Sequence, residues 1–556
     1  MSRLKTARGS ETVQKIAGIW NRCQAVPKSS SFLRMSSPEQ ISRRDLLSML
    51  GGAAALQALT GCTQPSETPT ANRKASDPLP PDIDFATALE VADAIQKKKV
   101  SSVELTRRMF DRIDRYNPQL NAFVYQLRNE AMEQAKKADE ALARGQSLGF
   151  FHGVPIHVKE SFAVAGRPCT WGIPELRDSK APRNSQAVER LVNAGAVLIG
   201  ATNVPVNLSD WQSYNPIYGS TNNPWDVKRT PGGSSGGTAA ALAAGIGYLS
   251  VGSDIGGSIR VPSHFCGTFG HKPTLELVSL DGHQPGGNPG LPGFSTLLAV
   301  GGPMARSAED LLAALKVLGG PDGWDAKAWK WDLPASRKTS LKDFRVGYVL
   351  EDSSAPLTAE VKAVLDQAIG TLQRAGATVK QGWPAGYKHA DLLSTYVFML
   401  FAFLYSASPP NVREGFRIPG NPTPPGAAPF ADWQAQNIRR LEFRAQWQKY
   451  FEEVDVFLSA VTPSEAFTHD HSEPIERRMI STSMGPMPYL NLFNWIAPAS
   501  LTGCPATVAP VGKTPSGLPV GIQIMGPYWE DATPITFAQL LARETGGFTP
   551  PPGYTT

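Results

Sequence analysis

A helix–glycine–strand pattern constrains the fold of this chain more than any other feature of its sequence. Residues 185–194 have the composition of a helix, Gly195 ends it, and the apolar residues 196–200 follow as a short buried strand. A strand that follows a helix in this way favours parallel pairing with an earlier strand. The sequence therefore predicts an α/β fold in which helices cover both faces of a sheet.

The same pattern returns in the C-terminal half of the chain. Residues 344–350 are expected to form a strand, residues 359–375 a helix that Gly376 ends, and residues 377–379 the next strand. A length of 556 residues is enough to bury a large core.

A long apolar helix is expected at residues 392–407, before a stretch rich in Pro and Gly at 408–429. The stretch is interpreted as a surface loop or as one side of a substrate entrance.

The positive charge of the chain is concentrated at its N-terminus. Residues 1–62 contain nine Lys and Arg and three Asp and Glu, a net charge of +6, whereas the whole chain carries +5. The remaining residues sum to about −1 and contain no cluster of Lys and Arg. Because a basic patch is the footprint of nucleic-acid binding, no nucleic-acid partner is predicted.

An export signal is predicted within residues 35–62. Arg43-Arg44 precedes a weakly apolar run from Leu46 to Leu59, which is typical of a twin-arginine signal. The run ends in Leu59-Thr-Gly-Cys62, which resembles a lipobox, so Cys62 is the predicted site of lipidation. An ordinary apolar helix beside an accidental arginine pair is the alternative.

The segments around this signal complete the expected organisation. Met35 lies eight residues before the arginine pair, so residues 1–34 are interpreted as an over-extended start. Residues 63–82 are rich in Pro, Thr and Ser and are expected to form a flexible tether, and residues 83–556 form the folded body. We expect an exported protein on the periplasmic side or in the cell envelope, anchored to the membrane through Cys62.

Two glycine-rich loops and one upstream lysine are the main chemical motifs. Thr230-Pro-Gly-Gly-Ser-Ser-Gly-Gly-Thr238 contains Ser234, and Gly252-Ser-Asp-Ile-Gly-Gly-Ser-Ile-Arg260 contains Ser258. Glycines around a nucleophile let backbone N–H groups approach a reacting carbonyl, as an oxyanion hole requires. Lys159 ends an apolar segment that begins at Gly153. Burial there favours the neutral amine, so Lys159 is a candidate base.

These motifs resemble those of the amidase signature family, which includes fatty acid amide hydrolase, malonamidase and the glutaminase subunit of tRNA amidotransferases. The resemblance covers the whole body and includes residues 155–161, 223–226, 302–304 and 517–526. It implies a large, twisted, mixed β-sheet with helices on both faces. It also implies hydrolysis of a small carboxylic acid amide to the acid plus ammonia or amine, with no cofactor and no metal.

The resemblance further implies a role for each site residue. Ser258 attacks the amide carbonyl and forms an acyl-enzyme. Ser234, whose peptide bond from Gly233 is cis in the family, passes the proton, and neutral Lys159 is the final base. Asp254 and Arg260 are interpreted as charges that brace the loop. The oxyanion hole is expected to consist of the backbone N–H groups of Ile255, Gly256, Gly257 and Ser258.

Several alternatives accompany this interpretation. Gly232-x-Ser234-x-Gly236 also fits the nucleophile elbow of α/β-hydrolases, which requires a buried strand before it, whereas residues 222–230 are polar and contain proline. A glutaminase subunit of an amidotransferase, an esterase of the same family and a non-enzymatic binding lipoprotein are the other candidates. Export argues against the amidotransferase, because charged tRNA and ATP are cytoplasmic.

The residues after Thr202-Asn203 bear on the substrate. In the family this segment lines part of the acyl site, and here Pro205 is followed by Val206, Asn207 and Leu208. Many bacterial members have an acidic and an aromatic residue here, whereas this segment is closer to the fatty-acid-amide pattern, so the resemblance implies an apolar or aryl acyl group. Leu208 is expected either as a pocket contact or as a core residue. Dimers are common in the family, so a homodimer is one expected assembly.

Overall fold

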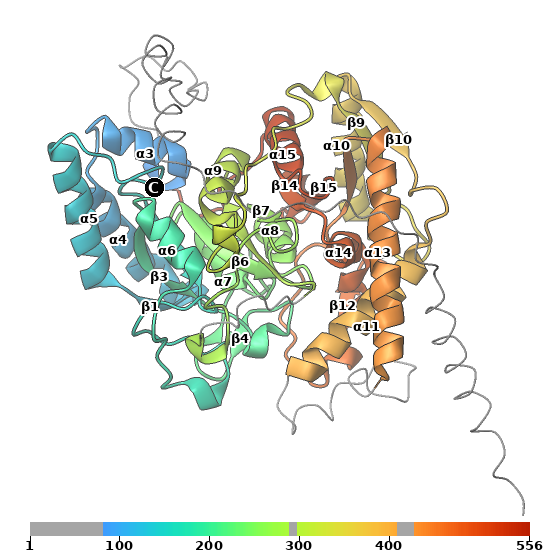
Figure 1. The fold of residues 1–556 in the computed structure, drawn as a ribbon, viewed down its shortest axis with the longest axis horizontal. Coiled ribbons are helices and arrows are strands. Elements are labelled where there is room, and N and C mark those ends of the chain that lie inside the picture. Colours follow the sequence, from blue (N-terminus) through green and yellow to red (C-terminus); the bar gives the residue numbers. More distant parts are fainter. Residues whose placement is uncertain (1–81, 289–296, 408–427, 556) are drawn as a thin grey trace, which may run out of the picture. The chain divides into compact units, whose positions relative to one another are not determined.

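One mixed β-sheet of eleven strands forms the centre of the folded body (Figure 1). The computed structural model describes residues 82–288, 297–407 and 428–555. The strands of the sheet, in chain order, are β1 (Phe123–Gln126), β2 (Pro155–Lys159), β3 (Val197–Thr202), β6 (Leu249–Asp254), β7 (Phe269–Lys272), β8 (Val300–Ala305), β9 (Arg345–Tyr348), β10 (Thr378–Gln381), β11 (Val456–Ala460), β14 (Ala506–Lys513) and β15 (Pro519–Met525). Across the sheet they lie in the order β1-β3-β2-β6-β8-β7-β14-β15-β11-β9-β10.

Helices cover the two faces of this sheet (Figure 1), which confirms the predicted fold class. The helices are α3 (Ala88–Gln96), α4 (Ser102–Leu120), α5 (Arg128–Ala143), α6 (Gln186–Asn193), α7 (Gly236–Ala243), α8 (Arg260–Cys266), α9 (Ala308–Leu318), α10 (Ala359–Arg374), α11 (His389–Ala407), α13 (Phe430–Glu453), α14 (Phe493–Thr502) and α15 (Ala532–Thr545). Two short hairpins lie outside the main sheet: β4 (Tyr214–Asn215) with β5 (Gly219–Ser220), and β12 (Met479–Thr482) with β13 (Gly485–Pro488).

Strand direction changes across the sheet. β3, β2 and β6 are parallel at one side, and β11, β9 and β10 are parallel at the other. From β6 through β8, β7, β14 and β15 to β11 every neighbouring pair is antiparallel. Parallel neighbours need a long crossover connection, and α6 lies between β2 and β3 in the chain, as α10 lies between β9 and β10. Both predicted helix–glycine–strand units therefore lie in the parallel parts of the sheet.

The residues that flank α6 begin and end the helix as the sequence predicted. Ser185 precedes the helix, and its hydroxyl accepts a hydrogen bond from the N–H of Val188. Gly195 follows the helix with φ +90°, a conformation in which a side chain would be strained. The chain can then turn directly into β3, all of which is buried.

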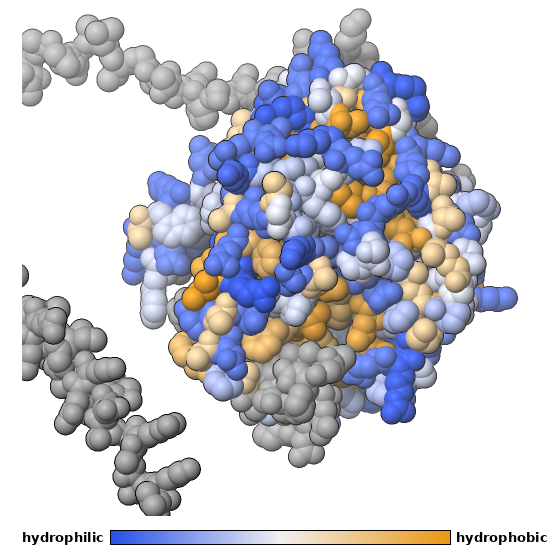
Figure 2. All heavy atoms as spheres, turned by 90° about the vertical axis from the view of Figure 1, so that its right-hand side faces the viewer, coloured by the Kyte–Doolittle hydropathy of each residue, from blue (hydrophilic) through white to orange (hydrophobic). Residues whose placement is uncertain are grey.

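α11 is the apolar helix that the sequence predicted at residues 392–407. Within the described residues, it is the one helix whose length and composition would suit a membrane span. Only 44% of that 18-residue window is buried, and α11 packs against α13 and α14. Figure 2, which views the molecule from the side of α13, shows apolar areas interspersed with polar ones, and Phe430, Ile438 and Leu441 are exposed large apolar residues of α13.

Several sequence-based expectations fall outside the described residues. These are the over-extended start at 1–34, the signal at 35–62 with Cys62, the tether except for its last residue, and most of the Pro- and Gly-rich stretch after α11. They remain predictions.

Candidate active site

The carboxyl ends of β2 and β6 carry the first polar side chains of the site. The two strands are parallel neighbours, with Val158 opposite Val251, so their last residues reach the same edge of the sheet. Lys159 is the last residue of β2, and Ser253 and Asp254 end β6. The fold thereby joins two motifs that are 94 positions apart in the sequence.

The amine of Lys159 is enclosed by protein. Lys159 is fully buried, and its Nζ lies 2.6 Å from Ser234 Oγ and 2.9 Å from Ser253 Oγ. Burial lowers the pKa of Lys159 from 10.5 to about 7, although the negative charges of Asp254 and Glu160 act in the opposite direction. A large fraction of the amine is therefore neutral at pH 7, and a neutral amine can accept a proton.

Ser234 lies in the loop before α7 and is almost completely buried. The peptide bond from Gly233 to Ser234 is cis, as the resemblance implied. Gly233 packs closely against the neighbouring chain, since an added Cβ would lie 2.5 Å from the carbonyl oxygen of Asp210. Only glycine fits at this position, so the sequence itself fixes how closely the loop approaches residues 210–212.

Ser258 lies in the loop between β6 and α8, beside the Ser234 loop. The N–H of Ser235 donates to the carbonyl of Ser258 at 3.1 Å, which ties the two loops together. Ser258 is buried except for 6% of its surface, and its hydroxyl makes no hydrogen bond to any of the described residues. The hydroxyl is therefore free to turn. The structure thus places all three residues of the predicted relay in one site.

The peptide groups around Ser258 differ from the expected oxyanion hole at one position. The N–H of Gly257 donates to Asp254 Oδ1 at 2.9 Å, so it is already engaged and the expectation for Gly257 is corrected. The N–H groups of Ile255, Gly256 and Ser258 have no acceptor among the described residues. Three of the four predicted donors therefore remain.

Hydrogen bonds to two carbonyls orient two of these donors. In a trans peptide, the C=O of one residue and the N–H of the next point in opposite directions. The hydroxyl of Tyr396 donates to the carbonyl of Ile255 at 3.0 Å, and the N–H of Val261 donates to the carbonyl of Gly257 at 2.7 Å. The N–H groups of Gly256 and Ser258 therefore point away from these partners.

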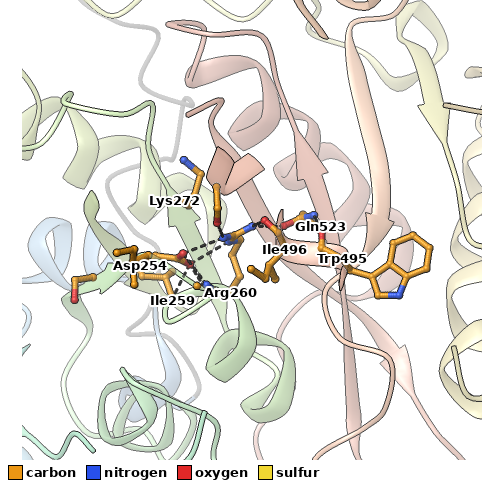
Figure 3. Close-up of polar contacts among 12 residues, drawn as sticks. Asp254, Ile259, Arg260, Lys272, Trp495, Ile496 and Gln523 are labelled. Carbon is orange, nitrogen blue, oxygen red and sulfur yellow. Dashed lines mark hydrogen bonds and ion pairs between the residues drawn. The ribbon is translucent and has the colours of Figure 1, made fainter. Parts of the chain in front are cut away.

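A buried ion pair braces the Ser258 loop, as predicted for Asp254 and Arg260 (Figure 3). Arg260 Nη2 lies 2.9 Å from Asp254 Oδ1, and both side chains are fully buried. Burial opposes ionisation of Asp254, but the charge and hydrogen bonds of Arg260, the charge of Lys272 and the N–H of Gly257 together lower the pKa of the carboxyl to about 2. Arg260 also donates to the carbonyl of Ile496 at 2.9 Å and to Gln523 Oε1 at 2.7 Å, so the loop is fixed to α14 and β15 (Figure 3).

Aromatic side chains surround Gly256, and the sequence interpretation did not identify them. Trp211 Nε1 donates to the carbonyl of Gly256 at 2.7 Å, and the ring of Trp211 lies 4.4 Å from that of Phe493. An added Cβ at Gly256 would lie 3.3 Å from the Tyr396 hydroxyl and 3.4 Å from Phe493. Sequence reasoning could have found Trp211, because it lies close to Leu208 in the sequence. It could not have found Tyr396 and Phe493, because they come from the distant helices α11 and α14.

Leu208 is the last residue of a short 3₁₀ helix, Val206–Leu208. It is half-buried, has φ +56°, and lies outside the hydrophobic core. Its predicted role as a pocket contact therefore stays a prediction, and core packing, the alternative, is wrong.

Ser253 is a second residue that the sequence interpretation missed. Its hydroxyl contacts the amine of Lys159, and the signal that could have found it is its place on β6, one residue before Asp254. The histidines near the motifs make ordinary contacts: His264 bonds the carbonyls of Gly521 and Ser464. Within the described residues, no cluster of three or more His, Cys, Asp or Glu side chains is arranged to hold a metal ion.

The alternative interpretation of Gly232-x-Ser234-x-Gly236 as a nucleophile elbow does not fit the structure. Residues 222–230 form turns and one isolated bridge, without the buried strand that an elbow requires. The partner of the Ser234 hydroxyl is Lys159, and no histidine contacts it in the described part of the chain.

Comparison with known proteins agrees with this geometry. A profile of the family described as Amidase matches residues 104–534. A glutamyl-tRNA(Gln) amidotransferase subunit of Nostoc sp. is 32% identical over 476 residues, which cover 80% of this chain and 94% of that protein. Among solved structures, an amidase is 27% identical, with a TM-score of 0.68 and coverage of 83% of this chain and 100% of that one. A bacterial aryl acylamidase of the amidase signature enzymes has a TM-score of 0.70 at 24% identity, covering 83% and 96%.

This chain belongs to the amidase signature family. Enzymes of the family hydrolyse amides, and the chain is an amidase.

Proposed function

We propose that this amidase hydrolyses its substrate through an acyl-enzyme on Ser258. Ser258 Oγ attacks the amide carbon, and its proton passes to Ser234, whose own proton passes to the neutral amine of Lys159. The tetrahedral intermediate collapses, the C–N bond breaks, and the relay returns a proton to the leaving ammonia or amine. Water then attacks the acyl-enzyme by the same relay and releases the acid.

One observation carries this proposal: the buried amine of Lys159 lies 2.6 Å from Ser234 Oγ. A neutral amine has one lone pair and two hydrogens, so Lys159 can accept from Ser234 while it donates to Ser253 at 2.9 Å. The pKa of about 7 makes this protonation state available at neutral pH.

We assign the oxyanion hole to the N–H groups of Ile255, Gly256 and Ser258. Removing one donor of such a hole typically costs about 3–4 kcal/mol of transition-state stabilisation. The carboxylate of Asp254, which accepts a hydrogen bond from the N–H of Gly257, keeps the loop in shape.

An apolar or aryl acyl group is the substrate class that fits this site best. Trp211, Phe493 and Tyr396 lie against Gly256, and Ile255 is half-buried beside them. The side chains nearest to an added Cβ at Gly256 are those of Tyr396 and Phe493, so a charged acyl chain that packed against them would lose its hydration without gaining a partner from these rings.

A glutaminase of the amidotransferase type is the second candidate, because several relatives of this chain are subunits of glutamyl-tRNA(Gln) amidotransferases. Glutamine has a charged α-amino acid end, so this candidate requires cationic and anionic contacts near Ser258. Ammonia release from glutamine by the isolated chain, at a rate above that from aryl and aliphatic amides, would favour it.

We further propose that the chain is exported and anchored through Cys62. The twin-arginine pattern and the lipobox-like Leu59-Thr-Gly-Cys62 support this proposal. Metabolic labelling with a palmitate analogue tests it, since Cys62→Ala should lose the label and wild type should carry it. Equal labelling of both proteins would contradict lipidation at Cys62.

A screen of aliphatic, aryl and peptide C-terminal amides on protein lacking residues 1–62 tests the catalytic proposal, with Ser258→Ala as its control. We expect amine or ammonia release from wild type, and a rate lower by a factor of about 10⁴ or more in the alanine variant. Equal rates in the two proteins would refute the proposal. Esters of the same acids, measured in parallel with the amides, show whether the enzyme hydrolyses amides or esters faster.

A further inference from the structure

The turn that follows Lys159 is held by a residue from another part of the chain. Ser161 Oγ and His283 Nε2 are 3.0 Å apart, although 122 positions separate the two residues. Both are buried, and His283 lies in the connection between β7 and β8. The N–H of Phe162 donates to the carbonyl of Lys159 at 3.0 Å, so Ser161 sits inside a tight turn that starts at the candidate base.

Two aromatic rings fix the orientation of the His283 imidazole. The ring of Phe162 lies 4.6 Å from it and the ring of Trp171 lies 4.9 Å from it, both tilted. Trp171 Nε1 also donates to the carbonyl of Ser161 at 3.2 Å. The imidazole is therefore held in one orientation, with its Nε2 directed at the hydroxyl of Ser161.

The charge state of His283 matters to Lys159. In the described part of the chain, three titratable groups interact electrostatically with the amine: Asp254 from the end of β6, the adjacent Glu160, and His283. Burial, and then the positive charge of Lys159, lower the pKa of His283 to about 3, so the imidazole is neutral at pH 7. A neutral ring adds no negative charge that would hold a proton on Lys159 and no positive charge that would repel one.

We propose that His283 is a positioning residue for the Lys159 base. Through its hydrogen bond with Ser161 it holds the turn after β2 in one conformation, and so it keeps the amine aimed at Ser234. This inference rests on the proposed role of Lys159. It assigns to His283 no contact with the substrate.

Four variants test the proposal: Ser161→Ala and His283→Leu remove the hydrogen bond, His283→Gln retains a hydrogen-bonding group, and His283→Asp adds a charge. We measure kcat and KM against pH, with the concentration of active sites counted by fluorophosphonate labelling of Ser258. Because small misplacements of a catalytic group are costly, Ser161→Ala and His283→Leu should lower kcat about tenfold or more and leave KM unchanged. His283→Gln should stay within about threefold of wild type.

The pH profile separates positioning from a general loss of structure. A carboxylate near Lys159 favours the ammonium form, so His283→Asp should move the acidic limb of kcat/KM to higher pH by about one unit. Folded Ser161→Ala and His283→Leu variants with wild-type kcat would overturn the proposal. If His283→Leu does not fold, Ser161→Ala decides it, since a wild-type kcat in that variant alone would overturn the proposal.

The outcome also distinguishes this inference from the proposed function. If Ser258→Ala hydrolyses amides as fast as wild type, the proposed function fails. If Ser258 is labelled and the wild-type limb is present, but Ser161→Ala and His283→Leu keep the wild-type kcat, only the role of His283 fails.

Discussion

The amine of Lys159 lies 2.6 Å from the hydroxyl of Ser234, and both side chains are buried. A lysine in this position cannot keep the charge that it carries in water without a large cost, because the desolvation of an ammonium outweighs the attraction of Asp254 and Glu160. The relay therefore depends on burial as much as on the identity of its residues.

Activity should depend on pH through Lys159. The base must be neutral, and the pKa of Lys159 is lowered to about 7, so kcat/KM should rise about tenfold per pH unit below about 7 and level off above it. Lys272→Met is the matched control, because Lys272 is equally buried and its pKa is also lowered to about 7. The acidic limb of kcat/KM should persist in Lys272→Met. Its loss in that variant would mean that the titrating group is Lys272 and not Lys159.

The stability of the folded chain should also depend on pH, because Lys159 is buried. Lys159 is neutral in the folded chain but protonated in the unfolded chain between about pH 7 and 10.5, so stability is lost as pH falls through this window. Lys159→Met should be inactive and more stable than wild type at pH 7, with a difference that shrinks as the pH approaches 10.5. Denaturant melts at pH 7, 8.5 and 10 measure it, and a constant difference would argue against a neutral buried amine.

Ser253 should contribute to the rate through Lys159. Ser253→Ala removes one of the two hydroxyls that contact the amine, and a hydrogen bond of this kind is worth about 0.5–1.5 kcal/mol. We expect kcat to fall about two- to tenfold with little change in KM. Ser253→Thr keeps the hydroxyl and should restore the rate, and an active Ser253→Ala beside an impaired Ser253→Thr would contradict the assignment.

Tyr396 should act through the oxyanion hole. Tyr396→Phe removes the hydrogen bond to the carbonyl of Ile255 that orients the N–H of Gly256, so kcat should fall about two- to tenfold. Tyr450→Phe is the control, because it removes a similar bond, to the carbonyl of Gly382, far from the site in the sheet order. Steady-state kinetics should show a lower kcat in Tyr396→Phe and an unchanged kcat in Tyr450→Phe.

Arg260 should matter for folding as well as for the rate. Arg260→Met leaves the carboxylate of Asp254 buried without its partner, which typically costs about 3–5 kcal/mol. Lys380→Met breaks an exposed ion pair with Glu453 and should leave the unfolding midpoint unchanged. Urea unfolding of both variants makes the comparison, and similar midpoints would mean that the brace is not a major source of stability.

The sequence predicted those parts of the fold that local signals determine. Ser185 and Gly195 mark the ends of α6 by capping and by a positive φ, and both act within a few residues of where they stand. The roles of Ser258, Ser234 and Lys159 came from the resemblance of their motifs to those of the amidase signature family, since glycine-rich loops by themselves are also typical of ordinary turns.

The rest depends on contacts between distant segments. Tyr396 and His283 reach the site only because α11 and the β7–β8 connection meet there, and pairing of this kind leaves no periodic trace in the sequence. The engagement of Gly257 by Asp254 is equally invisible, since every glycine of the loop looks like an available donor until the direction of each peptide group is known.

Fluorophosphonate labelling followed by peptide mapping identifies the nucleophile and its base in one experiment. We expect a single label on Ser258, with a rate that rises with pH up to about 7, as the pKa of Lys159 requires, and that falls sharply in Lys159→Ala and Ser234→Ala. A label on Ser234, or undiminished labelling of Ser258 in Lys159→Ala, would contradict this expectation.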